Sequence, residues 1–265
     1  MYAIELTQPK TLADAASILA STGGRPLAGG QSLVAAMKLR LSQPGTLVDL
    51  SGIPDLKGIR KDGERLVIGA MTRHAEIAAS DLVKSAAPAL ASVAEGIGDR
   101  QVRNMGTIGG SLANADPAAC YAAGVLAFNA TIQTDRRTIA ADDFFTGLWE
   151  TALQPGELIT AVSFPQVQKA AYVKYKQPAS RFALVGVCVA QTAGGVRVGV
   201  TGVKSHAFRA AEIENALAKS FTPEAAKAVK MPTTDINGDI HGSPEYRAAM
   251  VSVIASRAVA AALAR

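Results

Sequence analysis

Residues 25–33 read Arg25-Pro26-Leu27-Ala28-Gly29-Gly30-Gln31-Ser32-Leu33, and residues 106–112 read Gly106-Thr107-Ile108-Gly109-Gly110-Ser111-Leu112. Each stretch is a paired-glycine turn between a short apolar run and a segment with helical patterning. Glycine has no Cβ and adopts positive φ, so the chain can turn sharply and bring its N–H groups close to a ligand. A row of N–H groups at a turn or helix start binds anions. Two such turns, each followed by a serine, favour a ligand with more than one phosphate, such as a dinucleotide.

The composition is that of a globular chain with an aliphatic core. The 265 residues suffice for one large domain or two smaller ones, and only 5% of them are aromatic. The formal net charge is +5, without a dense run of lysine and arginine. This mild and scattered charge argues against nucleic acid as a partner.

The two cysteines, Cys120 and Cys188, lie far apart and form no CxxC pair. They cannot provide the four thiolates of an iron–sulfur cluster. The N-terminus has neither the basic nor the apolar part of a signal peptide. The apolar tail, 250–264, contains Arg257 and is too short for a membrane span. We therefore expect a cytoplasmic chain without a membrane span.

The order of elements changes near Pro165. Before it, strand, turn and helix alternate as in an α/β unit, and after it strands precede a group of helices. The patterns predict helices over 32–40, 82–95 and 118–128, strands over 66–70, 131–134, 139–145 and 158–164, and then three strands over 172–177, 182–192 and 196–203.

Motifs for common enzyme chemistry are missing. The chain has no GxSxG elbow, HExxH helix or P-loop, and Gly29-Gly30 lacks the third glycine of a Rossmann fingerprint. We assign no catalytic or metal-binding residue. Asp116, which follows the second turn, is a candidate partner for a ribose hydroxyl.

The two glycine turns and the residues behind them resemble the two FAD signatures of the medium subunit of molybdenum hydroxylases, the family of carbon monoxide dehydrogenase and xanthine dehydrogenase. The matching stretches are 28–40, 107–119, 68–72, 175–181 and 245–247. The resemblance implies an α+β fold: a two-part FAD-binding domain of the PCMH/vanillyl-alcohol-oxidase type over 1–166, with a small α/β subdomain and a mixed or antiparallel sheet. A C-terminal domain with a three-stranded antiparallel sheet and helices is expected over 167–265.

The resemblance also implies which residues hold FAD. They are Leu27, Ala28, Gly29, Gly30, Gln31, Ser32, Leu33, Ala70, Thr107, Ile108, Gly109, Gly110, Ser111, Asn114, Asp116, Leu158, Ile159 and Lys176. The two turns are expected to grip the diphosphate, and Lys176 to lie beside the isoalloxazine. The family often has histidine at positions 31 and 114, and many relatives have aspartate where this chain has Cys120.

The function implied is electron transfer. Substrate would be hydroxylated at molybdenum on a large molybdopterin subunit, and electrons would pass through [2Fe–2S] clusters of a small subunit to FAD on this chain. The acceptor would be NAD⁺, a quinone or another oxidant. Two alternatives stay open: a stand-alone flavoprotein oxidoreductase with its own small substrate, and a non-enzymatic nucleotide-sensing module.

Overall fold

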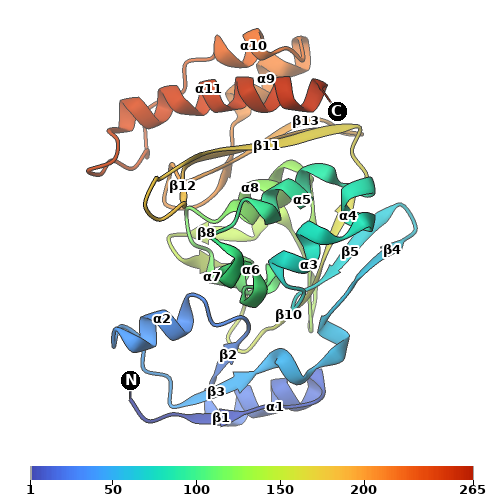
Figure 1. The fold of residues 1–265 in the computed structure, drawn as a ribbon, viewed down its shortest axis with the longest axis vertical. Helices are drawn as coiled ribbons and strands as arrows, with labels where there is room; N and C mark the ends of the chain where they lie inside the picture. Colours follow the sequence, from blue (N-terminus) through green and yellow to red (C-terminus); the bar gives the residue numbers. More distant parts are fainter. Residues whose placement is uncertain (1, 265) are drawn as a thin grey trace.

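The computed structural model describes residues 2–264, so the outermost limits of the two expected domains, residues 1 and 265, lie outside it. Figure 1 shows three units stacked along the long axis of the molecule. The first is a parallel sheet of order β1-β3-β2, with one long and one short helix. Its elements are β1 (Glu5–Thr7), α1 (Leu12–Thr22), β2 (Arg25–Leu27), α2 (Leu33–Lys38) and β3 (Thr46–Asp49).

The middle unit is an antiparallel sheet of order β4-β5-β10-β6-β7, accompanied by six short helices and a small hairpin. Its strands are β4 (Ile59–Asp62), β5 (Arg65–Gly69), β6 (Thr131–Thr134), β7 (Thr138–Ala140) and β10 (Ile159–Pro165), and the hairpin is β8 (Phe145–Gly147) with β9 (Glu150–Thr151). Its helices are α3 (His74–Ala79), α4 (Asp81–Ala86), α5 (Pro88–Glu95), α6 (Arg100–Met105), α7 (Ile108–Asn114) and α8 (Cys120–Ala127).

The third unit is an antiparallel sheet of order β11-β12-β13-β14, with α11 across one face and α5 and α8 on the other (Figure 1). Its elements are β11 (Lys169–Lys176), β12 (Ala183–Thr192), β13 (Gly195–Thr201), β14 (Phe208–Arg209), α9 (Ala211–Lys219), α10 (Pro223–Lys227) and α11 (Pro244–Leu263). Valines that alternate along β12 and β13 pack under α11.

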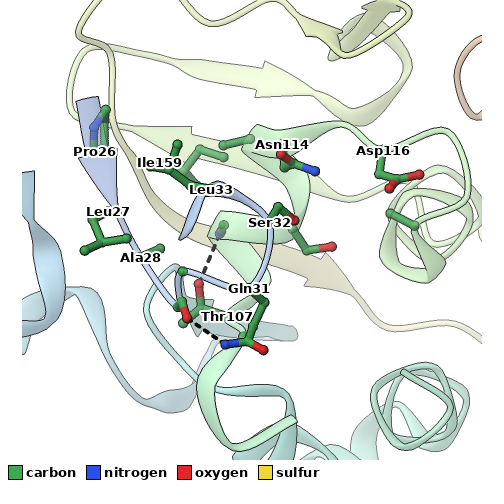
Figure 2. A pocket seen from close by; sticks show the side chains of 18 of the residues that line it. Pro26, Leu27, Ala28, Gln31, Ser32, Leu33, Thr107, Asn114, Asp116 and Ile159 are labelled. Carbon is green, nitrogen blue, oxygen red and sulfur yellow. Dashed lines mark hydrogen bonds between the residues drawn. The ribbon is translucent and has the colours of Figure 1, made fainter. Parts of the chain in front are cut away.

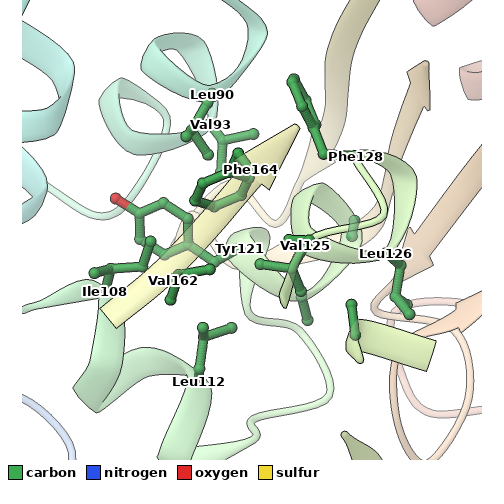
Figure 3. Close-up of a cluster of buried hydrophobic side chains, with 14 of the residues drawn as sticks. Leu90, Val93, Ile108, Leu112, Tyr121, Val125, Leu126, Phe128, Val162 and Phe164 are labelled. Atoms are coloured by element: carbon green, nitrogen blue, oxygen red, sulfur yellow. The ribbon is translucent and has the colours of Figure 1, made fainter. Parts of the chain in front are cut away.

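All eight residues of α8 are buried, because sheet and helices surround this helix. Figure 3 shows Tyr121, Val125 and Leu126 of α8 among Leu90, Phe128 and Phe164 from the neighbouring elements. Small residues permit the close packing: a Cβ at Gly199 of β13 would stand 2.9 Å from the backbone carbon of Ala123. The third unit is therefore in direct backbone contact with the middle one.

Three sequence predictions differ from the structure. The helix expected over 82–95 is broken between α4 and α5, because Pro88 forces Ala87 out of the helical conformation (φ −149°, ψ 63°). The strand expected over 139–145 is interrupted by the 3₁₀ turn Ala141–Asp143. The C-terminal sheet has four strands rather than three, because the two residues of β14 pair with β13.

The helix α11 includes the apolar tail but begins at Pro244, where Ser243, Pro244 and Glu245 predict a helix start, and by length and composition alone its 20 residues suffice to cross a membrane. Half of that stretch is buried within the fold, where α11 packs on β11 and β12. Its Arg247 is also buried and bonded to the carbonyl oxygens of Leu184 and Gly202, at 3.1 and 2.7 Å. These contacts are those of a core helix.

Candidate functional site

A cavity of about 1290 Å³ lies where the three units meet. Its walls include the segment between β2 and α2, the start of α7, the loop before β10 and the loop between β11 and β12. We call residues 28–33 the first glycine loop and residues 106–111 the second. Figure 2 shows the two loops beside each other, with Gln31, Ser32 and Thr107 close together.

The glycines let the two loops touch through their backbones. A Cβ at Gly29 would overlap the carbonyl oxygen of Met105 and stand 2.7 Å from the Cα of Gly106. A Cβ at Gly110 would stand 3.1 Å from the Cβ of Ala28. Contacts below 3.0 Å require the backbone to shift, so any side chain at Gly29 would separate the loops. The convergence inferred from the sequence is present.

The first glycine loop has unused hydrogen-bond donors. Gly30 adopts φ 72°, a conformation that favours glycine. Within the described chain, the N–H groups of Gly29, Gly30, Gln31 and Ser32 donate to no backbone or side-chain atom. Gly29 and Gly30 are half-buried and Gln31 and Ser32 are exposed, so these four successive donors at the cavity wall are open to an anionic ligand or water.

The second glycine loop differs, because most of its own N–H groups have partners within the protein. Gly109 donates to the carbonyl of Ala70 at 2.8 Å, and Gly110 donates to the Thr107 hydroxyl, which caps α7, at 3.1 Å. Ile108 donates to the carbonyl of Thr72 at 3.2 Å. The second loop therefore braces the first and fixes its position.

Nearly all residues that the resemblance assigned to FAD line this cavity. They are Leu27, Ala28, Gly29, Gly30, Gln31, Ser32, Leu33, Ala70, Thr107, Gly109, Gly110, Ser111, Asn114, Asp116, Leu158 and Ile159. Two do not: Ile108 is fully buried in the core below, and Lys176 is an exposed residue at the end of β11.

The lysine at the cavity is Lys174, two residues earlier. Its ammonium donates to the carbonyl oxygens of Gly96 and Arg181, at 2.6 and 2.9 Å, and lies 3.5 Å from the Cys120 sulfur. The β11–β12 register shifts between Tyr175 and Lys176, so the strand alternation that would place both lysines on the cavity side ends there. The sequence alone could not show which of the two lysines faces the cavity.

Asp116 and Cys120 lie behind the glycine loops. The N–H of Ala118 donates to the Asp116 carboxylate at 2.8 Å, yet burial raises the pKa of Asp116 overall. Cys120, at the first turn of α8, is buried against the cavity. A carboxyl group with a perturbed pKa inside a cavity is a common property of binding sites.

His74 is a cavity residue to which the sequence gave no role. It lies beneath the second loop, where a Cβ at Gly106 would stand 2.5 Å from its Nε2. Burial, and secondarily the charge of Arg103, lowers the pKa of His74 to about 4, so the ring is neutral at pH 7. Its Nδ1 is buried without a hydrogen-bond partner in the described chain.

The site fits a dinucleotide better than a metal. The free donors suit a diphosphate, and apolar residues on both sides suit rings: Leu50 and Leu158 toward the first unit, Ile97 and Phe182 toward the third. No group of three histidine, cysteine or acidic side chains among residues 2–264 is arranged to bind a metal ion. Fold and cavity together define a dinucleotide-binding protein.

The comparisons with known proteins identify the dinucleotide. The family model described as "FAD binding domain in molybdopterin dehydrogenase" matches residues 2–167. The chain belongs to this family, the FAD-binding subunits of molybdenum hydroxylases.

Similar chains extend over the whole length. The carbon monoxide dehydrogenase medium chain of Hydrogenophaga pseudoflava is 36% identical, over 98% of this chain and 97% of its own. The nicotine 6-hydroxylase medium subunit of Paenarthrobacter nicotinovorans is 33% identical, over 99% and 98%. Among solved structures, reconstituted CO dehydrogenase from Oligotropha carboxidovorans superposes with a TM-score of 0.91 at 35% identity, covering 100% of this chain and 99% of that one. The chain is thus the FAD-binding subunit of an oxidoreductase, with the fold that the resemblance implied.

Proposed function

We propose that this chain receives electrons from [2Fe–2S] clusters on a small partner subunit and passes them to a small-molecule acceptor. Two relatives of 36 and 37% identity over nearly their full length are named medium chains, which supports a complex with further subunits. Molybdenum and the iron–sulfur clusters would lie on those partners, in a heterotrimer or its dimer within the cytoplasm. Bound FAD supplies the chemistry, because a flavin exchanges electrons singly or in pairs.

The observation that carries the proposal is the row of free N–H groups from Gly29 to Ser32. These donors would hold the FAD diphosphate, and the second glycine loop would keep them in place. Asp116 and Asn114, which also line the cavity, would bind the ribose or ribityl hydroxyls, and Ala70, Leu158 and Ile159 would form an apolar wall against the rings. Lys174, rather than Lys176, would place a positive charge beside one ring system.

The test is purification of the chain with its native partners. We expect a yellow preparation with about one FAD per chain, together with an iron–sulfur and a molybdenum-containing subunit. A chain that carries FAD but no partners, and that turns over a substrate of its own, would favour the stand-alone flavoprotein. A chain whose bound nucleotide never changes redox state would favour the sensing module.

A further inference from the structure

The thiol of Cys120 is a nucleophile at the cavity that the proposed function leaves unused. Cys120 is 6% exposed and lines the cavity at the first turn of α8. Its sulfur is therefore shielded from bulk solvent but open to a small molecule inside the cavity. Cys188 is fully buried within β12 and does not line the cavity. Of the two thiols, only that of Cys120 can meet a molecule in the cavity.

An ammonium group lies against this sulfur. Lys174 has three N–H donors, and each of them has an acceptor. Two acceptors are the carbonyl oxygens of Gly96 and Arg181, at 2.6 and 2.9 Å, and the third is the sulfur of Cys120, at 3.5 Å. The two carbonyls hold the ammonium in place, and a fixed cation stabilises the negative charge on a sulfur that attacks an electrophile. This contact distinguishes Cys120 from a cysteine that only packs in a core.

A buried hydroxyl group faces the same thiol. Tyr172 lies two residues before Lys174 on β11, so both side chains are on one face of the strand. The Tyr172 hydroxyl is buried and makes no hydrogen bond to a nitrogen or oxygen atom in the described part of the chain. Burial, and then the neighbouring thiol of Cys120, raises the pKa of Tyr172 well above its usual range, so the hydroxyl keeps its proton. A buried donor normally has an acceptor, and an oxygen atom added to the Cys120 sulfur would provide one.

We propose that Cys120, Lys174 and Tyr172 form a site at which a hydroperoxide oxidises the Cys120 thiol to a sulfenic acid. The sulfur attacks one oxygen of the peroxide, an S–O bond forms, and the O–O bond breaks. With hydrogen peroxide, the thiol proton goes to the leaving oxygen, which departs as water. The sulfur loses two electrons and the peroxide gains them. The ammonium and the phenolic hydroxyl are the donors that would bind the peroxide oxygens.

The peroxide has a source in the same cavity, and this part of the proposal rests on the proposed function. Dioxygen takes two electrons and two protons from reduced FAD and becomes hydrogen peroxide. Cys120 and the two glycine loops line one cavity, so peroxide formed there meets the thiol before it reaches bulk solvent. Cellular thiols reduce a sulfenic acid. The modification is therefore a reversible switch in the wall of the cofactor cavity.

Hydrogen peroxide added to the FAD-free chain tests the thiol site by itself. Dimedone traps sulfenic acids, and peptide mass spectrometry locates the adduct. We expect the adduct on Cys120 and not on Cys188. The absence of an adduct on Cys120, or equal labelling of both cysteines, would overturn the proposal.

Two matched pairs of variants test the neighbouring groups. Lys174→Met removes the ammonium and Tyr172→Phe removes the hydroxyl, and each should slow the oxidation of Cys120 at least tenfold. Lys176→Met and Tyr175→Phe remove the same groups from exposed positions on the same strand and should leave the rate unchanged. Tyr172→Phe keeps the packing of the ring, so it stays informative if Lys174→Met does not fold. A wild-type rate in Tyr172→Phe would refute the site as drawn.

A second measurement follows peroxide made at the flavin. The FAD-loaded chain is reduced chemically without oxygen, freed of reductant and exposed to dioxygen in the presence of catalase, which destroys peroxide that leaves the cavity. Dimedone is then added with urea so that it reaches both cysteines. We expect the adduct on Cys120, and its absence there would refute FAD as the source of the peroxide. If the chain binds no FAD at all, the proposed function fails, while added peroxide still decides whether the thiol site exists.

Discussion

Gly29 in the first glycine loop lies directly against Met105, the last residue of α6, with no space for a side chain between them. A Cβ at position 29 would overlap the Met105 carbonyl oxygen. Gly29→Ala should therefore push the loops apart, lower the affinity for FAD at least tenfold and destabilise the chain by about 1–3 kcal/mol, the usual cost of overpacking. FAD content after gel filtration and urea unfolding of the FAD-free chain measure the two effects.

The matched control is Gly45→Ala. A Cβ at Gly45 meets no atom within 4 Å, and its φ is not left-handed. This variant should keep the FAD content and unfolding free energy of the wild type. If Gly29→Ala behaves like Gly45→Ala, the loops are not held together by this contact.

Much of the site could be predicted because its signal is local. Paired glycines followed by serine predicted a sharp turn with accessible N–H groups at both sites, which holds for Gly29-Gly30, whereas Gly109 and Gly110 lie in the first turn of α7. What the sequence could not show is which donors stay free: the N–H groups of Gly109 and Gly110 are consumed by Ala70 and Thr107. The bond of Gly109 depends on how α7 packs against the residue that follows β5, whereas the bond of Gly110 is made within the second loop, to the hydroxyl that caps α7.

Lys174 and Tyr172 were missed for different reasons. Lys174 and Lys176 are two residues apart on β11, so a regular strand would place both side chains on the same face. The register shift after Tyr175, which separates them, depends on the partner strand β12. Tyr172 belongs to no motif, and only its buried hydroxyl beside Cys120 singles it out. The break at Pro88, in contrast, could have been predicted from the sequence, because a proline disfavours the helical conformation of the residue before it.

A charge at the first glycine loop should abolish FAD binding. Gly30 has φ 72°, which both aspartate and asparagine tolerate better than most residues. Gly30→Asp places a carboxylate beside the expected diphosphate, and we expect a loss of affinity of at least a hundredfold. Gly30→Asn has nearly the same shape, including the tight 3.0 Å approach of the Cβ to Val34, but no charge. The FAD dissociation constants of the two variants are measured by flavin fluorescence, and their ratio gives the effect of the charge alone. Equal constants would mean that the FAD phosphates do not lie beside Gly30.

FAD should protect one cysteine from alkylation. Cys120 borders the cavity, whereas Cys188 is fully buried within β12. With N-ethylmaleimide, we expect Cys120 of the FAD-free chain to react and saturating FAD to slow that reaction at least tenfold. Peptide mass spectrometry identifies the modified residue, and Cys188 serves as the internal control. Equal rates with and without FAD would mean that the cofactor does not reach α8.

Stability should fall in mild acid because of His74. Its pKa is lowered from 6.5 to about 4, so the unfolded chain binds more protons than the folded chain between these values. The free energy of unfolding is therefore highest above pH 6.5 and decreases as the pH falls toward 4. The titration of His74 accounts for roughly 3 kcal/mol of this decrease in total. His74→Gln cannot titrate and should flatten the change of unfolding free energy across this window, whatever its effect at pH 7. Urea unfolding of both proteins between pH 4 and 7 tests this. Parallel curves would show that His74 titrates normally, and hence that its ring is not held neutral beneath Gly106.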